Sequence, residues 1–194
     1  MTAEQSTCEP PDVITVKRTA EEKISDAEAV LNRTIGFIEN SESKTGIALT
    51  MVGIMMTVIF AMAGNDVMSM FSAIRHNPDA AGILFILLFF LSLTASVYGM
   101  CQFARVLVPS LECEKDSRIY FGKISGNRDY EEYRSKMERY GPEDHLDDLW
   151  SQIYVNSKIC IRKYRYFKHG LRTTVPGMFA VLAVIVIFRF LILG

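Results

Sequence analysis

Cysteine is sparse in this sequence and is not arranged for a bridge or a metal site. The four cysteines, at positions 8, 101, 113 and 160, form no Cys-x-x-Cys pair and follow no regular spacing. Because zinc sites and disulfide frameworks depend on such spacing, we expect free thiols in a reducing compartment instead. No apolar segment opens the chain, so the sequence predicts no secretory signal peptide.

Sequence motifs of enzymes are also absent. No His-Glu-x-x-His, Gly-x-Ser-x-Gly, P-loop or Gly-x-Gly-x-x-Gly pattern occurs, and each of these marks a large enzyme or nucleotide-binding class. The three histidines are scattered, and the His-Leu-Asp-Asp stretch at 145–148 lacks the second His/Asp set of a metal phosphohydrolase. We therefore expect a protein that is not an enzyme, with no catalytic residue, no metal site and no cofactor.

Charge is missing from three long hydrophobic blocks. The blocks at 45–64 and 80–103 contain no charged residue, and the block at 174–193 contains only Arg189. Because about 20 helical residues cross a ~30 Å hydrocarbon core, the blocks predict three transmembrane helices; the alternative is three buried helices of a soluble protein. Arg189 is close enough to the end of its span to reach the far interface, and a pore-lining arginine is the alternative.

Positive charge is concentrated on one side of these spans. Arg162, Lys163, Arg165, Lys168 and Arg172 precede the third span, whereas segment 65–79 between the first two contains a single arginine and no lysine. Cytoplasmic loops of membrane proteins carry an excess of such residues. We therefore expect a cytoplasmic N-terminus, an external loop at 65–79 and a cytoplasmic region at 109–173.

The polar segments divide into a tail, a stalk and a cytoplasmic region. Residues 1–18 are polar and contain paired prolines, which predicts a disordered tail. In 19–44 apolar residues recur every seven positions, typical of an amphipathic helix leading into the first span. The predicted fold class is an all-α membrane protein: three transmembrane helices, a cytoplasmic helical region between the second and third, and an N-terminal amphipathic stalk helix.

A long helix is predicted to begin at Pro142, which suits a first helical turn. We expect this helix to end at Gly170 and the last span to begin near Pro176. One stripe of the helix repeats at intervals of four and three; this assembly seam comprises Leu146, Trp150, Ile153, Ser157, Cys160, Tyr164 and Phe167. The seam predicts packing against the stalk or against the same helix of another subunit, and hence a homo-oligomer in the second case.

Small residues share one stripe of the second span. Ser92, Ser96 and Gly99 recur at intervals of four and three, and small residues let two membrane helices approach closely. The partner helix belongs either to the same chain or to another subunit.

Three segments resemble one family. The stretch "NSESKTGIALTMVGIMMTVI" is similar to the "ADTKAS"-type junction of the Pycsar transmembrane effectors, and "RIYFGKIS" resembles their "YFGDI"-type motif. The stretch "EDHLDDLWSQIYVNSKICIRKYRYFKHGLR" is similar to their signature helix, "L..D...QIY..S.I...KY". The resemblance covers residues 20–194 in order and spacing, with Lys123 where the family has an acid. Related two-span effectors of bacterial nucleotide-signalling conflict systems share the layout.

The resemblance implies an antiphage-defence effector of the bacterial inner membrane. A partner pyrimidine cyclase would make cUMP or cCMP on infection, and the effector would respond by disrupting the membrane, causing growth arrest or abortive infection. Membrane lipids, the cyclic nucleotide and further copies of the chain are the expected partners, and nucleic acid is not. The alternative function is an oligomeric membrane scaffold or small channel without direct nucleotide sensing.

A small nucleotide needs positive charge, hydrogen-bond donors and an aromatic surface for its base. The two cytoplasmic motifs offer these groups, and the candidate ligand-binding residues are Tyr120, Phe121, Gln152, Tyr154, Lys158, Arg162, Lys163 and Tyr164. Aromatic packing is the alternative role for Tyr120 and Phe121. Membrane orientation and attraction of anionic lipid are the alternative roles for the basic residues.

Overall fold

The computed structural model describes residues 18–76, 80–110 and 117–190, and this part of the chain is helical without strands. Its elements are α1 (Ala20–His76), α2 (Ala80–Leu107), α3 (Phe121–Ile124), α4 (Tyr130–Glu138) and α5 (Pro142–Phe188). The tail expected at 1–18 lies outside the described residues, apart from Arg18.

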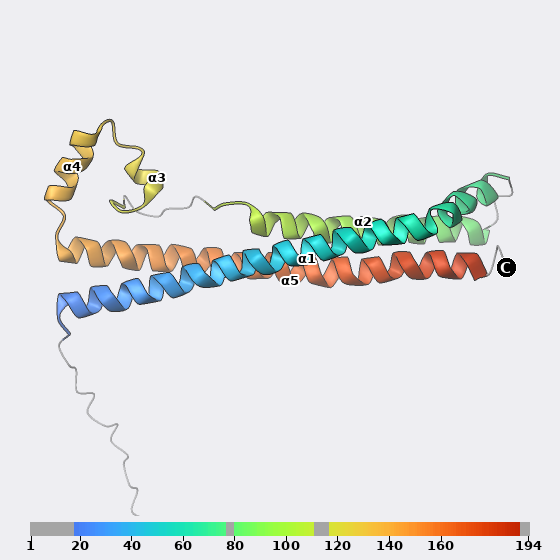
Figure 1. Ribbon diagram of the computed structural model, residues 1–194, viewed down its shortest axis with the longest axis horizontal. Helices are drawn as coiled ribbons and strands as arrows, with labels where there is room; N and C mark the ends of the chain where they lie inside the picture. Colours follow the sequence, from blue (N-terminus) through green and yellow to red (C-terminus); the bar gives the residue numbers. More distant parts are fainter. Residues whose placement is uncertain (1–17, 77–79, 111–116, 191–194) are drawn as a thin grey trace, which may run out of the picture.

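The three long helices lie side by side as an extended rod, with α2 packed along only one half of it (Figure 1). The chain passes along the rod in α1, returns in α2 and passes along it again in α5, so α1 and α5 are parallel (Figure 1). Three polar contacts hold α1 and α5 in nearly constant register. They join Glu28 to His145 (3.5 Å), Glu42 to Lys163 (2.7 Å) and Asp66 to Arg189 (3.2 Å).

The stalk and the first span form one helix. α1 runs for 57 residues without interruption, through the predicted stalk and the first hydrophobic block. Its buried side chains keep to one stripe along this length: Ala27, Leu31, Ser41, Thr45, Val52, Ala63 and Met70. α1 also continues to His76, so most of the loop expected at 65–79 is helical.

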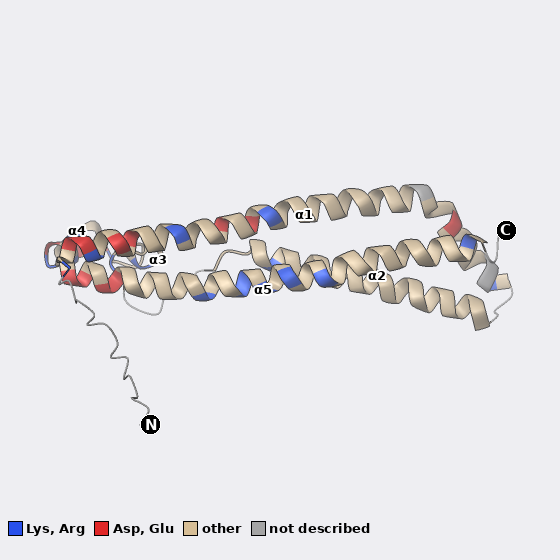
Figure 2. Cartoon of the chain, turned by 90° about the horizontal axis from the view of Figure 1, so that it is seen from below, with Lys and Arg blue, Asp and Glu red and all other residues tan. Residues whose placement is uncertain are grey.

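One half of the rod has the character of a membrane domain. α1, α2 and α5 each contain a stretch long and apolar enough to cross a membrane. Lys, Arg, Asp and Glu occupy the half of the rod without α2 and the level of the adjoining end of α2, and they reappear at the far tip, leaving the part between almost free of charge (Figure 2). The prediction of an all-α protein with three spans is therefore confirmed.

The helices pack through separate hydrophobic clusters along the rod. In the membrane half, Phe89, Val181 and Phe188 are among the buried members of one cluster. Near the middle, Val52 of α1, Phe103 of α2 and Met178 of α5 form another. At the charged end, α1 contributes Ala27 and Leu31, and α5 contributes Leu146 and Leu149.

α5 does not end at Gly170, contrary to the expectation from the sequence. The helix runs unbroken from Pro142 to Phe188, through both Gly170 and Pro176. Gly170 is needed for close packing, because a Cβ at this position would lie 2.7 Å from the Phe103 ring. Pro176 removes one backbone donor, which neighbouring helices allow a membrane-spanning helix to tolerate. The cytoplasmic helix and the third span are therefore one continuous element.

Candidate functional site

A small polar domain sits at the charged end of the rod. It consists of residues 117–141, including α3 and α4, and is called the head below; it projects to one side of the paired α1 and α5 (Figure 1). Asp148 of α5 attaches it, because its Oδ2 atom accepts hydrogen bonds from the backbone N–H of Arg118 and the hydroxyl of Tyr140, both at 2.9 Å. Ser117 and Gln152 add a second contact between head and α5 at 3.4 Å.

The Tyr140 hydroxyl stays protonated in this arrangement. Burial of the side chain raises the pKa of Tyr140 well above its usual value, and the hydrogen bond to the Asp148 carboxylate raises it further. The Arg118 guanidinium lies 5.3 Å from the centre of the Tyr140 ring, a cation–π arrangement. Asp148 is buried, so its acceptor oxygen depends on these partners for the hydrogen bonds that water would otherwise supply.

Local sequence signals shape α4 and the turn before it. Asp129 caps the helix by accepting a hydrogen bond from the backbone N–H of Glu132 at 2.9 Å. This bond lowers the pKa of Asp129, and the hydrogen bond from Lys136 lowers the pKa of Glu132. The Lys136 ammonium also donates to the side-chain oxygen of Asn127 at 2.7 Å, which closes the turn between α3 and α4.

A basic cavity of about 250 Å³ lies between α3, α4 and the start of the head. Three cationic side chains line it, from Arg118, Lys123 and Lys136. The remaining lining residues are Ser117, Ile124, Asn127 and Tyr133. Positive charge, amide and hydroxyl groups and one aromatic ring therefore meet in a space suited to a small anion with a planar part.

The sequence that forms the head, the long α5 and the three spans is similar to known proteins. Residues 26–190 match the family described as the Pycsar effector protein domain. The chain belongs to this family. It is 24% identical over 175 residues to the Pycsar effector protein EcPycTM of Escherichia coli, covering 87% of this chain and 91% of that protein. It is 26% identical over 174 residues to the Pycsar effector protein GmPycTM of Gulbenkiania mobilis, covering 78% of this chain and 88% of that protein. No solved structure shows a significant match.

The family resemblance drawn from short motifs is thus confirmed, and the fold shows what one of those motifs builds. The Pycsar-like segment "RIYFGKIS", residues 118–125, supplies three of the seven residues that line the basic cavity. The Tyr120 ring lies against Gly122, where a Cβ would come within 2.8 Å of it, and its centre is 4.8 Å from that of Phe121. Tyr120 and Phe121 therefore form an aromatic pair beside the cavity.

The candidate ligand residues of α5 do not gather at one place in the structure. From Gln152 to Tyr164 they extend over roughly 18 Å of helix. Gln152 contacts the cavity residue Ser117, whereas the Lys158 ammonium lies 4.0 Å from the centre of the exposed Tyr154 ring. Arg162 donates to the hydroxyl of Ser110 at 3.2 Å, in the segment that follows α2.

Two further candidates lie farther along the same helix. Lys163 is buried, and its ammonium contacts the carboxylate of Glu42 and the carbonyl oxygens of Val106 and Val108. Tyr164 lines a separate groove between α1 and α5. Lys163 thus has a structural role at the junction of the three long helices.

The assembly seam is only partly covered within the chain. Leu146 is buried against α1, but Trp150 and Tyr164 are exposed by 54% and 38%. The other members, Ile153, Ser157, Cys160 and Phe167, are partly buried. The fully buried positions of this part of α5 are Leu146, Asp148, Leu149, Val155, Ile159 and Lys163, so the stripe that faces the rest of the chain is rotated relative to the seam.

None of the seven residues that line this cavity was among the candidate ligand-binding residues from sequence. Their signal in the sequence is weak, because they follow no spacing that points to a shared site before α3 and α4 fold against each other. Arg118 and Lys123 flank the Tyr120–Gly122 turn in the family motif, and only that motif could have indicated these two residues from the sequence.

Among the described residues, no group of three His, Cys, Asp or Glu side chains is placed to hold a metal ion.

Proposed function

We propose that this protein is an antiphage-defence effector of the bacterial inner membrane, activated by a cyclic pyrimidine mononucleotide from a partner cyclase. Membership of the Pycsar effector family and the names of the two relatives support this proposal. The observation that carries it is the basic cavity of the head, built in part by the family motif and attached to a helix that continues into a membrane span.

The cavity offers the chemistry that a cyclic nucleotide requires. Arg118, Lys123 and Lys136 supply positive charge for the phosphate, and a charge-assisted hydrogen bond contributes about 1.5–3 kcal/mol. The side-chain oxygen of Asn127, which already accepts from Lys136, has a second lone pair for a donor on the base, and Tyr133 offers a ring against which the base can stack. A small cavity of about 250 Å³ favours a mononucleotide over a longer oligonucleotide.

The connection from cavity to membrane runs through Asp148. This residue holds the head to α5, and α5 continues from there to Phe188, roughly 60 Å along the helix. A ligand changes the membrane domain only if it binds one arrangement of head and α5 better than another. We infer that the nucleotide favours an arrangement in which the spans of several copies damage the membrane, which stops growth before phage release.

Assembly of several copies has a candidate surface on α5. Trp150, Tyr154 and Ile161 are exposed by 54%, 54% and 63% on the half of α5 that α2 does not cover. Large apolar side chains exposed together are typical of an interaction surface. We infer that the N-terminus and the head face the cytoplasm, where the cyclase product is made, because most basic residues lie on that side of the spans.

Calorimetry on the full-length, detergent-solubilised protein tests this function. cUMP or cCMP should bind the wild-type protein, with cAMP and cGMP as purine comparisons. Lys136→Gln should weaken binding by about tenfold, because one charged contact to the phosphate is lost. In cells that carry the partner cyclase, the same variant should fail to arrest growth on phage infection.

Arg134→Gln is the matched control. Arg134 lies on the same helix and pairs with Glu138 at 3.1 Å, as Lys136 pairs with Glu132 at 2.9 Å, both four residues apart. Arg134 does not line the cavity, so this variant should bind nucleotide and arrest growth as the wild type does. A wild-type protein that binds neither pyrimidine nucleotide, yet forms a stable oligomer, would favour the constitutive scaffold or small channel.

A further inference from the structure

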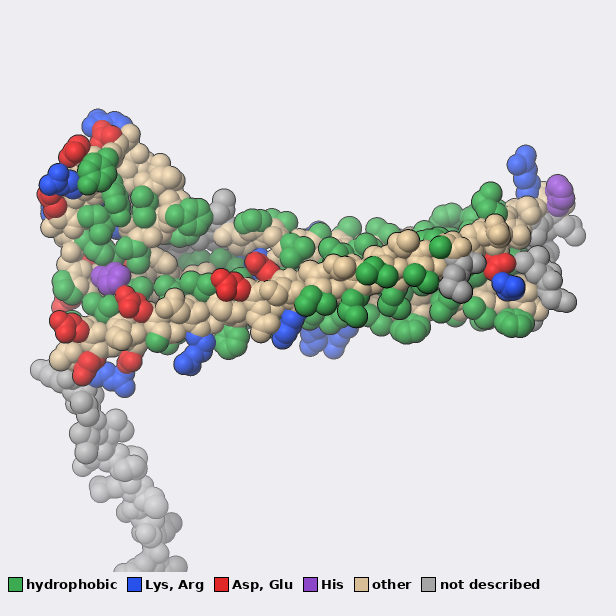
Figure 3. Space-filling view, in the orientation of Figure 1, with side chains coloured by type: hydrophobic (Ala, Val, Ile, Leu, Met, Phe, Trp, Pro, Cys, Tyr) green, Lys and Arg blue, Asp and Glu red, His purple; other side chains and the backbone are tan. Residues whose placement is uncertain are grey.

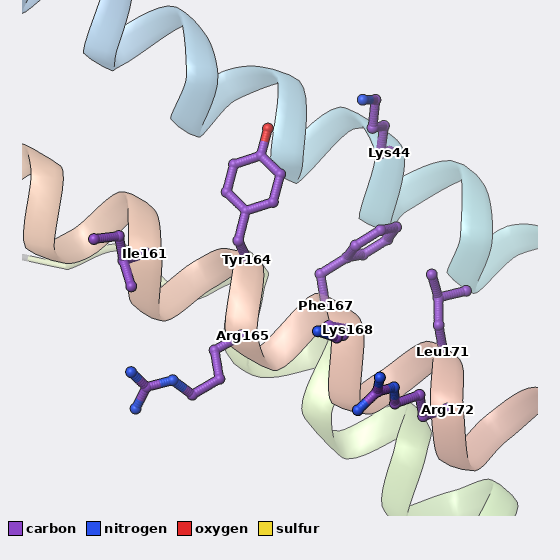
Figure 4. Close-up of a pocket in the computed structure, with 8 residues that line it drawn as sticks. All are labelled: Lys44, Ile161, Tyr164, Arg165, Phe167, Lys168, Leu171 and Arg172. Carbon is purple, nitrogen blue, oxygen red and sulfur yellow. The ribbon is translucent and has the colours of Figure 1, made fainter.

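A second hollow lies far from the head, between α1 and α5 where the charged half of the rod meets the apolar half. It is a groove of about 590 Å³ lined by both helices. Tyr164, Phe167 and Leu171 point from α5 toward α1, whereas Arg165 and Arg172 extend from the other edge of α5 and Lys44 from the outer side of α1 (Figure 4). The groove therefore has an aromatic and aliphatic floor with cations along both sides.

The charge at this groove is of one sign. Its cations are Lys44, Arg165, Lys168 and Arg172, and no carboxylate lines it. Among the residues that the structure describes, none of the four forms an ion pair or a side-chain hydrogen bond. Because four cations and no carboxylate line this groove, it attracts an anion.

A wholly apolar hollow continues from the groove toward the membrane half. It has a volume of about 310 Å³ and shares Leu171 with the basic groove. Along α5 it reaches Leu182, and along α1 it extends from Ala48 to Ile59. Either stretch is about 16 Å long at 1.5 Å per residue, which is close to half of a ~30 Å hydrocarbon core. The apolar hollow thus matches the depth of one leaflet.

The position of the two hollows along the rod also agrees with a membrane leaflet at the level of the apolar hollow. Lys44 and Arg172 are the last cations before the uncharged parts of α1 and α5. In the space-filling view, Lys and Arg side chains gather at the lower edge of the rod where the largely hydrophobic surface begins (Figure 3). The basic groove therefore lies at headgroup level and the apolar hollow at the level of the acyl chains.

We propose that the two hollows form one binding site for a single anionic phospholipid. The phosphate lies among Lys44, Arg165, Lys168 and Arg172, where arginine can bind two phosphate oxygens at once. One acyl chain lies along α1 and α5, against side chains such as Met51, Met55 and Phe179. The lipid bridges α1 to α5 just beyond the Lys163–Glu42 contact. This site is independent of the nucleotide cavity and does not rest on the proposed function.

Other occupants fit these observations less well. A second copy related by twofold symmetry would bring the same cations of both subunits together, because such an interface uses one surface twice. A free nucleotide or phosphate would satisfy the cations but would leave the adjoining apolar hollow unfilled. An anionic phospholipid accounts for both halves of the site and for their order along the membrane normal.

Native mass spectrometry of the full-length protein in detergent tests the site. With added phosphatidylglycerol, the wild type should retain one lipid, and phosphatidylcholine should be retained much less. Arg165→Gln combined with Arg172→Gln should weaken retention about 25-fold, which is about fivefold for each charge. Leu171→Trp should abolish retention of phosphatidylglycerol, because the larger side chain blocks the passage between the two hollows while all four cations remain.

Two controls match these variants. Arg134→Gln with Arg139→Gln makes the same charge change in the head, and Leu91→Trp adds the same bulk at an exposed position of α2. Both should retain phosphatidylglycerol as the wild type does. Equal retention by Leu171→Trp would overturn the proposal in favour of diffuse attraction to surface charge. Displacement of the lipid by inorganic phosphate alone, or a dimer that holds no lipid, would overturn it in favour of a free anion or a second copy.

Discussion

The ammonium nitrogen of Lys163 lies 2.7 Å from Oε1 of Glu42, which joins α5 to α1 at the level where α2 ends. The same ammonium donates to the backbone carbonyls of Val106 and Val108 at the C-terminal end of α2. A cation at this end of a helix also interacts favourably with the helix dipole. The Lys163 side chain is 4% exposed and that of Glu42 is 38% exposed. One buried lysine therefore links all three long helices at the base of the membrane domain.

Replacing Lys163 should loosen this junction. Lys163→Met removes the partner of Glu42 and of the Val106 carbonyl, which we expect to cost about 2 kcal/mol, less than a fully buried pair because Glu42 is partly hydrated. The melting temperature of the detergent-solubilised protein, followed by circular dichroism, should fall. Adding Glu42→Gln should cost less in the Lys163→Met background than in the wild type. Additive losses from the two changes would contradict a direct contact.

Close packing of α2 on α5 should depend on two glycines. A Cβ at Gly99 would lie 2.0 Å from Oγ1 of Thr174, and one at Gly177 would lie 3.0 Å from the backbone nitrogen of Ser96. Gly99→Ala and Gly177→Ala should each cost about 1–3 kcal/mol through overpacking, seen as a lower melting temperature. Gly53→Ala is the control, because its Cβ would meet no atom within 4 Å and alanine favours the helix. Melting unchanged by all three substitutions would show that α2 and α5 are not packed this closely.

The attachment of the head should weaken at alkaline pH. The pKa of Tyr140 is raised by burial and by its hydrogen bond to Asp148, so the folded protein holds this proton more tightly than the unfolded chain does. The stabilisation is present below the usual tyrosine pKa of about 10 and is lost progressively as pH rises above it.

Tyr140→Phe isolates that effect. In a titration followed by tyrosinate absorbance, the variant should lack the ionisation of Tyr140, which occurs above the usual tyrosine pKa, and its stability should decline less steeply above pH ~10. Asp148→Asn should lower the pKa of Tyr140 toward its usual value, because it removes the charge that opposes ionisation. A wild-type titration in which every tyrosine ionises together would contradict the buried contact.

The spans and the stalk could be predicted because each depends on a pattern within one segment. An uncharged block such as 80–103 has the length that a bilayer demands, and the stripe that includes Ala27 and Leu31 repeats with the period of a helix. The stripe of Ser92, Ser96 and Gly99 in α2 predicted a close helix–helix contact, and the structure shows that its partner is α5 of the same chain. The predicted helix end at Gly170 was wrong, because the missing side chain of this glycine allows close packing against Phe103 inside a continuous helix.

The sequence by itself determined the helical membrane character, the number of spans and the family, because hydrophobic length, helical period and short motifs are properties of contiguous residues. Only the tertiary structure decided which polar residues meet. Lys163 reaches Glu42 across more than a hundred positions of sequence, and Arg118 joins Lys136 at one cavity only after α3 and α4 fold together. Lys44 joins Arg172 at one groove because α1 and α5 run parallel. Burial and charge neutralisation depend on these distant partners, so the role of each cation followed from packing and not from its place in the chain.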